Sequence, residues 1–112
     1  MKQRCDLLLV EPDAAYGRVQ AVVFRRLGYT VRLVHTRASA LRAIRTAVYD
    51  LGVVDLFVAG GGPELARELA RGVRRLVLSV GPSLARAEVL AAAAGFPVHR
   101  KVALTRVLRR RR

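Results

Sequence analysis

The sequence predicts one α/β domain with a doubly wound, five-stranded parallel sheet. Short apolar runs, typical of strands buried on both faces, alternate five times with segments whose apolar residues recur at helical spacing. A chain of 112 residues with 53% hydrophobic side chains is sufficient for one domain with a proper core. Because strands and helices alternate, we expect parallel strands, right-handed crossovers and helices on both faces of the sheet.

The first half of the chain contains two such strand–helix units. The apolar run DLLLV at 6–10 predicts the first strand. Helical spacing follows at 12–27, where Pro12 suits the first turn and Gly28 the end of the helix. The β-branched and aromatic run YTVRLV predicts a strand at 29–34, and helical spacing returns at 38–48.

The second half contains three further units. The segment LGVVDLFV at 51–58 is apolar except for Asp55, and three glycines at 60–62 separate it from a short helix at 63–71. The run LVLSV predicts a strand at 76–80, and a helix is expected at 83–94 with Ser83 as its N-cap. A short strand at 96–99 then precedes a basic amphipathic helix at 102–112. We expect residues 1–112 to form a single domain with a basic tail at 109–112.

Charge and cysteine content narrow the functional classes. Twenty-one lysines and arginines against eight acids give a net charge of +13, which attracts polyanions or acidic partners. The arginines are spread over every segment, so ordinary solvated charge explains them equally well, whereas lysine occurs only at Lys2 and Lys101. A single cysteine, Cys5, and the lack of a long apolar run or a signal peptide favour a cytoplasmic protein.

Functional side chains are predicted to gather at the carboxyl ends of the strands, where open α/β sheets bind ligands. Glu11 and Asp13 follow the first strand, Asp55 lies near the end of the third, Ser79 at the end of the fourth, and Lys101 after the fifth. Carboxylates this close repel one another unless a cation lies among them, and Mg²⁺ is the simplest expected cation. Such a set suits phosphoryl transfer: a carboxylate attacks phosphorus while the metal, the lysine and the hydroxyl stabilise the phosphate oxygens.

Four segments in the right order carry a resemblance to a known family. LLLVEPD, YDLGVVDLFVAGGG, RRLVLSV and AAGFPVHRKVAL together resemble the receiver domain of two-component response regulators, over essentially the whole chain. The resemblance implies a flavodoxin-like (βα)5 receiver fold. It implies that Asp55 accepts a phosphoryl group from a phosphohistidine of a sensor histidine kinase or phosphotransfer protein. It further implies an Mg²⁺ site formed by Glu11, Asp13, Asp55 and the backbone carbonyl of Phe57, with Ser79 and Lys101 as phosphate-binding and switch residues.

The sequence departs from the family pattern in three places. Pro12 occupies the position of the usual second acid, so metal binding depends on whether Asp13 substitutes for it. Asp13 can equally serve the amino terminus of the first helix, where negative charge is favourable, and both interpretations stay open. Val102 follows the lysine in place of proline, and Val98 occupies the aromatic switch position, so signalling through that aromatic is expected to be altered.

Three functional hypotheses remain. The first is a stand-alone receiver, not an enzyme, that signals through a downstream protein partner or a homodimer after phosphorylation of Asp55. The second, favoured by Pro12, is a degenerate receiver that binds partners without phosphorylation. The third is a basic adaptor that contacts nucleic acid through the arginines at 109–112, although the sequence contains no known DNA-reading motif.

Overall fold

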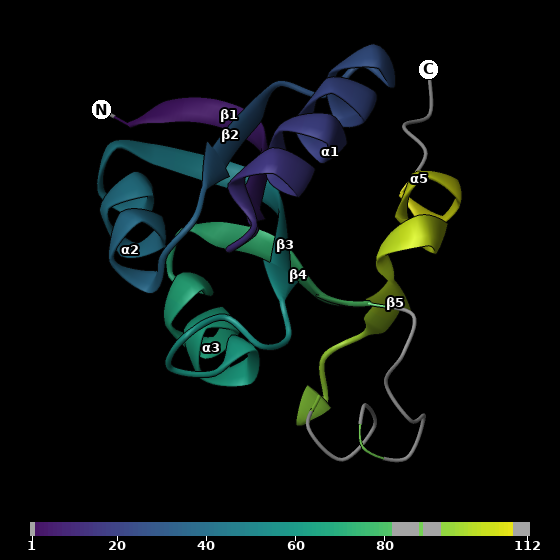
Figure 1. Cartoon of the computed structure of the whole chain (residues 1–112). Helices are drawn as coiled ribbons and strands as arrows, with labels where there is room; N and C mark the ends of the chain where they lie inside the picture. Colours follow the sequence, from purple (N-terminus) through teal and green to yellow (C-terminus); the bar gives the residue numbers. More distant parts are fainter. Residues whose placement is uncertain (1, 82–87, 89–92, 109–112) are drawn as a thin grey trace.

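A parallel five-stranded sheet lies between two layers of helices in the computed structural model of the chain, which describes residues 2–81, 88 and 93–108 (Figure 1). The strands are β1 (Gln3–Val10), β2 (Val31–Val34), β3 (Ala47–Asp55), β4 (Val73–Val80) and β5 (Val98–Arg100). The helices are α1 (Ala14–Arg26), α2 (Arg37–Thr46), α3 (Gly62–Leu69), the 3₁₀ turn η1 (Lys101–Ala103) and α5 (Leu104–Val107). The strand order is β2-β1-β3-β4-β5, so the expected doubly wound parallel sheet is confirmed.

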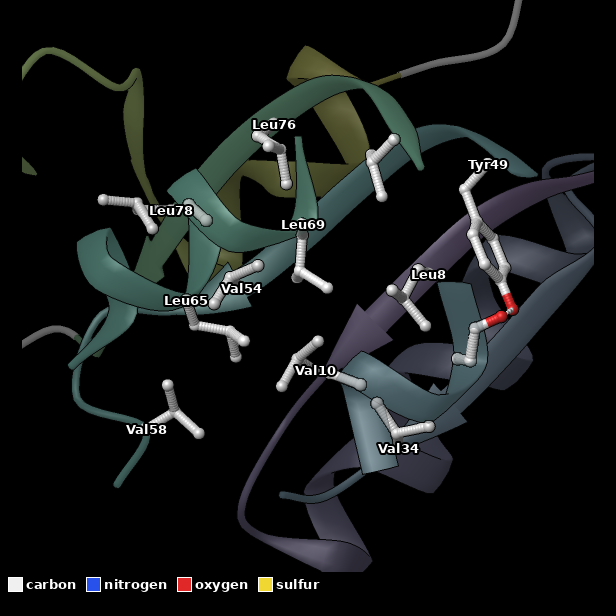
Figure 2. Close-up of a cluster of buried hydrophobic side chains, with 14 of the residues drawn as sticks. Leu8, Val10, Val34, Tyr49, Val54, Val58, Leu65, Leu69, Leu76 and Leu78 are labelled. Carbon is white, nitrogen blue, oxygen red and sulfur yellow. Dashed lines mark hydrogen bonds between the residues drawn. The ribbon is translucent and has the colours of Figure 1, made fainter. Parts of the chain in front are cut away.

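Alternation along the strands divides the core into two layers. Successive side chains of a strand point to opposite faces, so Leu7 and Leu9 of β1 pack on one side and Leu8 and Val10 on the other. The first layer lies under α1 and α5, and the second lies under α2 and α3 (Figure 1). Figure 2 shows the second layer, in which side chains from the helices meet those of the central strands. Both faces of the sheet are therefore buried, which explains the continuous apolar runs in the sequence.

One boundary difference concerns the second helix and the third strand. The sequence predicts a helix at 38–48 and a strand at 51–58, but α2 ends at Thr46 and β3 runs from Ala47 to Asp55 without an intervening loop. Ala47 and Tyr49 are buried while Val48 is exposed, which is the two-residue period of a strand. Asp55 is thus the last residue of β3, and Leu56 to Val58 lie beyond the strand.

The carboxyl-terminal part differs more from the prediction. The final helix, expected at 102–112, consists of η1 and α5 over the described residues, and β5 runs over 98–100 instead of 96–99. The helix expected at 83–94, with its N-cap Ser83, and the basic tail at 109–112 lie for the most part outside the described residues. In the part of the chain that the structure describes, no helix combines the length and the apolar character needed to span a membrane.

Candidate functional site

Three of the expected site residues lie on one face of the sheet, directly after a row of buried apolar side chains on neighbouring strands. Leu9 pairs with Val53 and Val53 pairs with Val77 on the face that α1 and α5 cover. Two residues further along the chain, and therefore on the same face, lie Glu11, Asp55 and Ser79.

These polar residues remain part of the sheet, and they are buried. The backbone N–H of Glu11 donates to Val34, which continues the hydrogen bonding of β1 with β2, and Asp55 pairs with Ser79 in register. Only 2% of Glu11, 8% of Asp55 and 1% of Ser79 is exposed. The carboxyl edge of the sheet thus places two carboxylates and a hydroxyl next to a closed apolar layer.

Lys101 joins the two carboxylates. Its ammonium nitrogen lies 2.7 Å from Glu11 Oε1 and 2.7 Å from Asp55 Oδ2, and 14% of its side chain is exposed. Lys101 is the first residue after β5, so its side chain extends from the edge strand toward the ends of β1 and β3. The expected meeting of Glu11, Asp55 and Lys101 in one place is what the structure contains.

Backbone donors fix the other oxygen of each carboxylate. The N–H of Asp13 donates to Glu11 Oε2 at 3.2 Å, and the N–H of Phe57 donates to Asp55 Oδ1 at 2.8 Å. Each buried carboxylate therefore has one oxygen facing the lysine and one held by the loop that follows its own strand. This arrangement satisfies charges that would be costly to bury alone.

Opposing effects act on the pKa of Lys101. Burial lowers it, but the hydrogen bonds to Asp55 and Glu11 and the negative charges of both carboxylates outweigh burial, so that the pKa is raised above its ordinary value. The ammonium also lies 5.3 Å from the centre of the Tyr16 ring, a distance at which the ring face attracts a cation. Lys101 is thus held in its charged form within the site.

Asp13 does not join the cluster. It is the N-cap of α1, and its Oδ1 accepts the N–H of Tyr16 at 3.0 Å, while the residue as a whole is exposed. This is the helix-terminus role that the sequence left open beside metal ligation. Metal ligation by Asp13 and by the carbonyl of Phe57 remains a prediction.

The residues at the site can bind a divalent cation, but with fewer protein ligands than the sequence predicts. The Glu11 and Asp55 carboxylates supply the oxygen ligands that Mg²⁺ prefers. Their oxygens each have a second lone pair beyond the contacts described above. Among the described residues, however, no group of three or more His, Cys, Asp or Glu side chains is placed to hold a metal ion. Glu11 and Asp55 already lie together and would hold a metal, while ligation by Asp13 remains a prediction.

The glycine-rich segment after β3 is a closely packed turn. A side-chain carbon on Gly62 would lie 2.7 Å from the Asp55 carbonyl oxygen and 2.7 Å from Leu56 Cα. Gly60 and Gly61 have φ angles of 92° and 93°, which favour glycine. The segment lets α3 begin directly against the end of β3, beside Asp55.

Two neighbours of the site were not foreseen from the sequence. Tyr16 lies near Lys101, and the ring nitrogen Nδ1 of His35 lies 2.9 Å from the backbone oxygen of Glu11. His35 directly follows β2, so its position after a strand carried a signal of the same kind as Glu11. The sequence signal for Tyr16 was weak, because it is only an aromatic residue in the first turn of α1.

An open hollow reaches Lys101 from the solvent. Its volume is about 360 Å³, and the residues that line it are Tyr16, Gly81, Arg100, Lys101 and Val102. Two of these five residues are cationic, so the approach to the lysine favours an anion. Val98, at the position of the expected aromatic switch, pairs with Leu78 and packs against the core under α3.

Solved structures of response regulators share this architecture. A response regulator from Burkholderia pseudomallei, with a phosphorylated aspartic acid, a calcium ion and citrate, matches with a TM-score of 0.77 and 20% identity over 96% of this chain. This chain spans only 64% of that protein. A receiver protein from Burkholderia phymatum matches with a TM-score of 0.74 and 22% identity, covering 96% of this chain and 92% of the other.

A response regulator from Thermotoga maritima, in complex with Mg²⁺ and BeF, matches with a TM-score of 0.71 and 20% identity, covering 95% of this chain and 93% of the other. No protein-family model and no curated protein matches the sequence. Identities of this size establish the architecture alone. The chain therefore has the (βα)5 fold of response regulator receiver domains, with an acidic and lysine-containing site at the carboxyl edge of its sheet.

Proposed function

We propose that this chain is a signalling receiver domain in which Asp55 accepts a phosphoryl group. The observation that carries the proposal is the position of Lys101, whose ammonium contacts Asp55 and Glu11 at 2.7 Å each at the carboxyl edge of the sheet. A buried carboxylate beside a fixed cation can act as a nucleophile whose product is stabilised at once. The fold supports the proposal, since its solved relatives include a phosphorylated aspartic acid and a complex with Mg²⁺ and BeF.

The donor in this proposal is a phosphohistidine of a histidine kinase or phosphotransfer protein. A carboxylate oxygen of Asp55 forms the new P–O bond while the P–N bond of the donor breaks, and the electron pair of that bond returns to the imidazole ring. Lys101 pairs with a phosphoryl oxygen, and Ser79, the register neighbour of Asp55, supplies a hydroxyl on the same face. A divalent metal held by Glu11 and Asp55 would neutralise further phosphoryl charge. In this role the chain is a substrate of the kinase and signals to a downstream protein.

Phosphorylation is tested by adding Mg²⁺ and acetyl phosphate and following the intact mass, and by recording amide NMR spectra with Mg²⁺ and beryllium fluoride. We expect one added phosphate, and shifts of the resonances around Asp55 and Lys101. Asp55→Asn should abolish both responses. Asp50→Asn is the matched control, because Asp50 lies in the first half of the same strand, away from Lys101 and beside Arg4 and Arg74. A phosphate that still adds to Asp55→Asn would contradict the proposal.

A second candidate is a degenerate receiver that binds its partner without phosphorylation. The capping role of Asp13 favours it, because only two carboxylates are then left beside Lys101 for a metal. The absence of any response at millimolar Mg²⁺, with a folded protein, would select this candidate. Asp13→Asn separates the roles of that residue, since the amide retains the helix cap but removes the charge. Loss of the Mg²⁺ response in this variant would assign metal ligation to Asp13.

A further inference from the structure

An open groove lies between α2 and α3 at the amino edge of the sheet, opposite the Lys101 site. Its volume is about 630 Å³, and it lies where α2 and α3 end and β1 begins. Its lining consists of two apolar residues, one acid and four cations: Leu41, Ile44, Glu68, Lys2, Arg45, Arg67 and Arg71. Neither phosphorylation of Asp55 nor the proposed signalling function accounts for this groove.

The positive charge of the groove is not neutralised internally. Glu68 is already paired with Arg37, and the Lys2 ammonium donates to the backbone oxygen of Ile44 at 2.8 Å. Within the described part of the chain, Arg45, Arg67 and Arg71 are exposed and form no ion pair. Basic residues are common at helix carboxyl ends because of the helix dipole. Here, cations from α2, from α3 and its following turn, and from the residue before β1 line the same groove. The dipole of a single helix does not explain this arrangement.

The floor of the groove is apolar. Leu41 and Ile44 lie on the same side of α2, one turn apart, and both are half-buried where they pack against the core. The accessible parts of these side chains face a hollow surrounded by arginines. An occupant that places an apolar side chain on the floor and carboxylates at the rim would complement both properties.

We propose that this groove docks an acidic, amphipathic segment of a partner protein. The arginines pair with carboxylates of the segment in bidentate fashion, and Leu41 and Ile44 contact an apolar residue between them. Nucleic acid fits less well, since none of the described residues that line the groove is aromatic and available for base stacking, and phosphates gain nothing from an apolar floor. The docking segment is therefore recognised by alternating charge and apolar side chains.

The test uses a short fluorescein-labelled peptide that repeats Glu-Glu-Leu, with fluorescence anisotropy as the measure of binding to the full chain. A peptide that repeats Glu-Glu-Gly has the same charge but no apolar side chain. We expect the first peptide to bind more tightly, and its amide NMR footprint to fall on α2 and α3. An oligonucleotide and phosphatidylserine vesicles serve as the other anionic probes.

The variant Arg67→Gln/Arg71→Gln should weaken binding of the Glu-Glu-Leu peptide roughly tenfold. The matched control is Arg18→Gln/Arg26→Gln, which removes equal charge from exposed positions on α1, on the other face of the sheet. Circular dichroism confirms that both variants fold. Equal weakening by the two variants, or equal binding of the two peptides, would overturn the proposal. Preferential binding of the oligonucleotide or of the vesicles through Arg67 and Arg71 would also overturn it.

Docking at the groove is independent of the phosphoryl-acceptor proposal. Asp55→Asn should bind the Glu-Glu-Leu peptide as the unaltered chain does. Failure of phosphorylation therefore leaves this inference standing, and failure of peptide binding leaves the proposed role of Asp55 standing.

Discussion

The ammonium nitrogen of Lys101 lies 2.7 Å from Asp55 Oδ2, and this contact joins the edge of the sheet to its centre. Lys101 follows β5, which has three residues, whereas Asp55 ends the nine-residue β3. The strand β4 lies between them. The ion pair thus stabilises the position of the short edge strand as well as preparing the site for an anion. The effect of Lys101 on stability and the pKa of its side chain can both be measured.

Replacement of Lys101 by methionine should destabilise the folded state at neutral pH. One oxygen of Glu11 and one of Asp55 each lie 2.7 Å from the ammonium nitrogen, so the two carboxylates are close to each other. Without the ammonium, these two buried carboxylates repel each other. We expect the free energy of unfolding to fall by about 2–4 kcal/mol at pH 7. Urea denaturation followed by circular dichroism measures this change.

The same variant should recover stability in acid. Acid adds protons to carboxylates, so the repulsion between Glu11 and Asp55 in Lys101→Met disappears as the pH falls, and the loss of stability should become smaller. Lys2→Met is the matched control, because Lys2 is exposed and makes one hydrogen bond to Ile44, and it should change stability by no more than about 0.5 kcal/mol. A loss in Lys101→Met that does not diminish toward pH 4 would contradict the charge explanation.

The raised pKa of Lys101 can be observed directly. Lysine occurs only at positions 2 and 101, so Lys2→Arg leaves a single lysine signal in a ¹³Cε NMR titration. We expect its midpoint above the ordinary lysine pKa of about 10.4, because the contacts with Asp55 and Glu11 outweigh burial. In Asp55→Asn the midpoint should move down, since one of these partners loses its charge. A midpoint that is the same in both proteins would show that Asp55 does not determine the pKa.

The raised pKa of Lys101 also determines how the stability of the folded chain depends on pH. A folded-state pKa that is raised means that the ion pairs contribute fully below the ordinary lysine pKa, and that their contribution is lost as the pH rises through the raised value. Burial, the largest effect on Tyr49, also raises the pKa of that phenol. A stability curve in base therefore combines the two groups, and the lysine signal separates them.

The sheet and the central site residues were predictable because they depend on local pattern and on strand order. Continuous apolar runs indicated strands buried on both faces, and the ends of parallel strands meet at one edge of the sheet. Glu11, Asp55 and Lys101 all follow or end strands of this sheet, so their meeting was predictable from strand order. The beginning of β3 at Ala47 was less visible, because Ala47 and Val48 also continue the apolar spacing of α2.

The remaining features depend on tertiary geometry that a sequence pattern does not express. Asp13 could serve a metal or a helix cap, and only the direction of its side chain decides which group it contacts in the structure. Tyr16 meets Lys101 because α1 packs across the end of β1, where a side-chain carbon on Gly17 would lie 3.3 Å from Glu11 Cβ. Close packing of this kind has no periodicity in the sequence.

Gly62→Ala should destabilise the protein through backbone crowding. The added carbon would lie 2.7 Å from the Asp55 carbonyl oxygen and from Leu56 Cα, and backbone atoms cannot turn away as a flexible side chain can. We expect a loss of about 1–3 kcal/mol, measured by urea denaturation. Gly81→Ala is the matched control, because no atom of the described residues lies within 4 Å of its added carbon. Unchanged stability should accompany Gly81→Ala, and similar losses in both variants would contradict the crowding argument.

Asp13→Ala should weaken α1, because the Tyr16 N–H at the start of the helix loses its acceptor. Removal of an N-cap costs roughly 0.5–2 kcal/mol of stability, whereas Asn and Ser retain a capping oxygen. Asp13→Asn should therefore remain within a few tenths of a kcal/mol of the unaltered protein. Hydrogen exchange of the Tyr16 amide locates the effect, since that amide is the capped donor. Equal destabilisation by Ala and Asn would instead assign the effect to the negative charge beside the helix amino terminus, and the cap geometry would then contribute little.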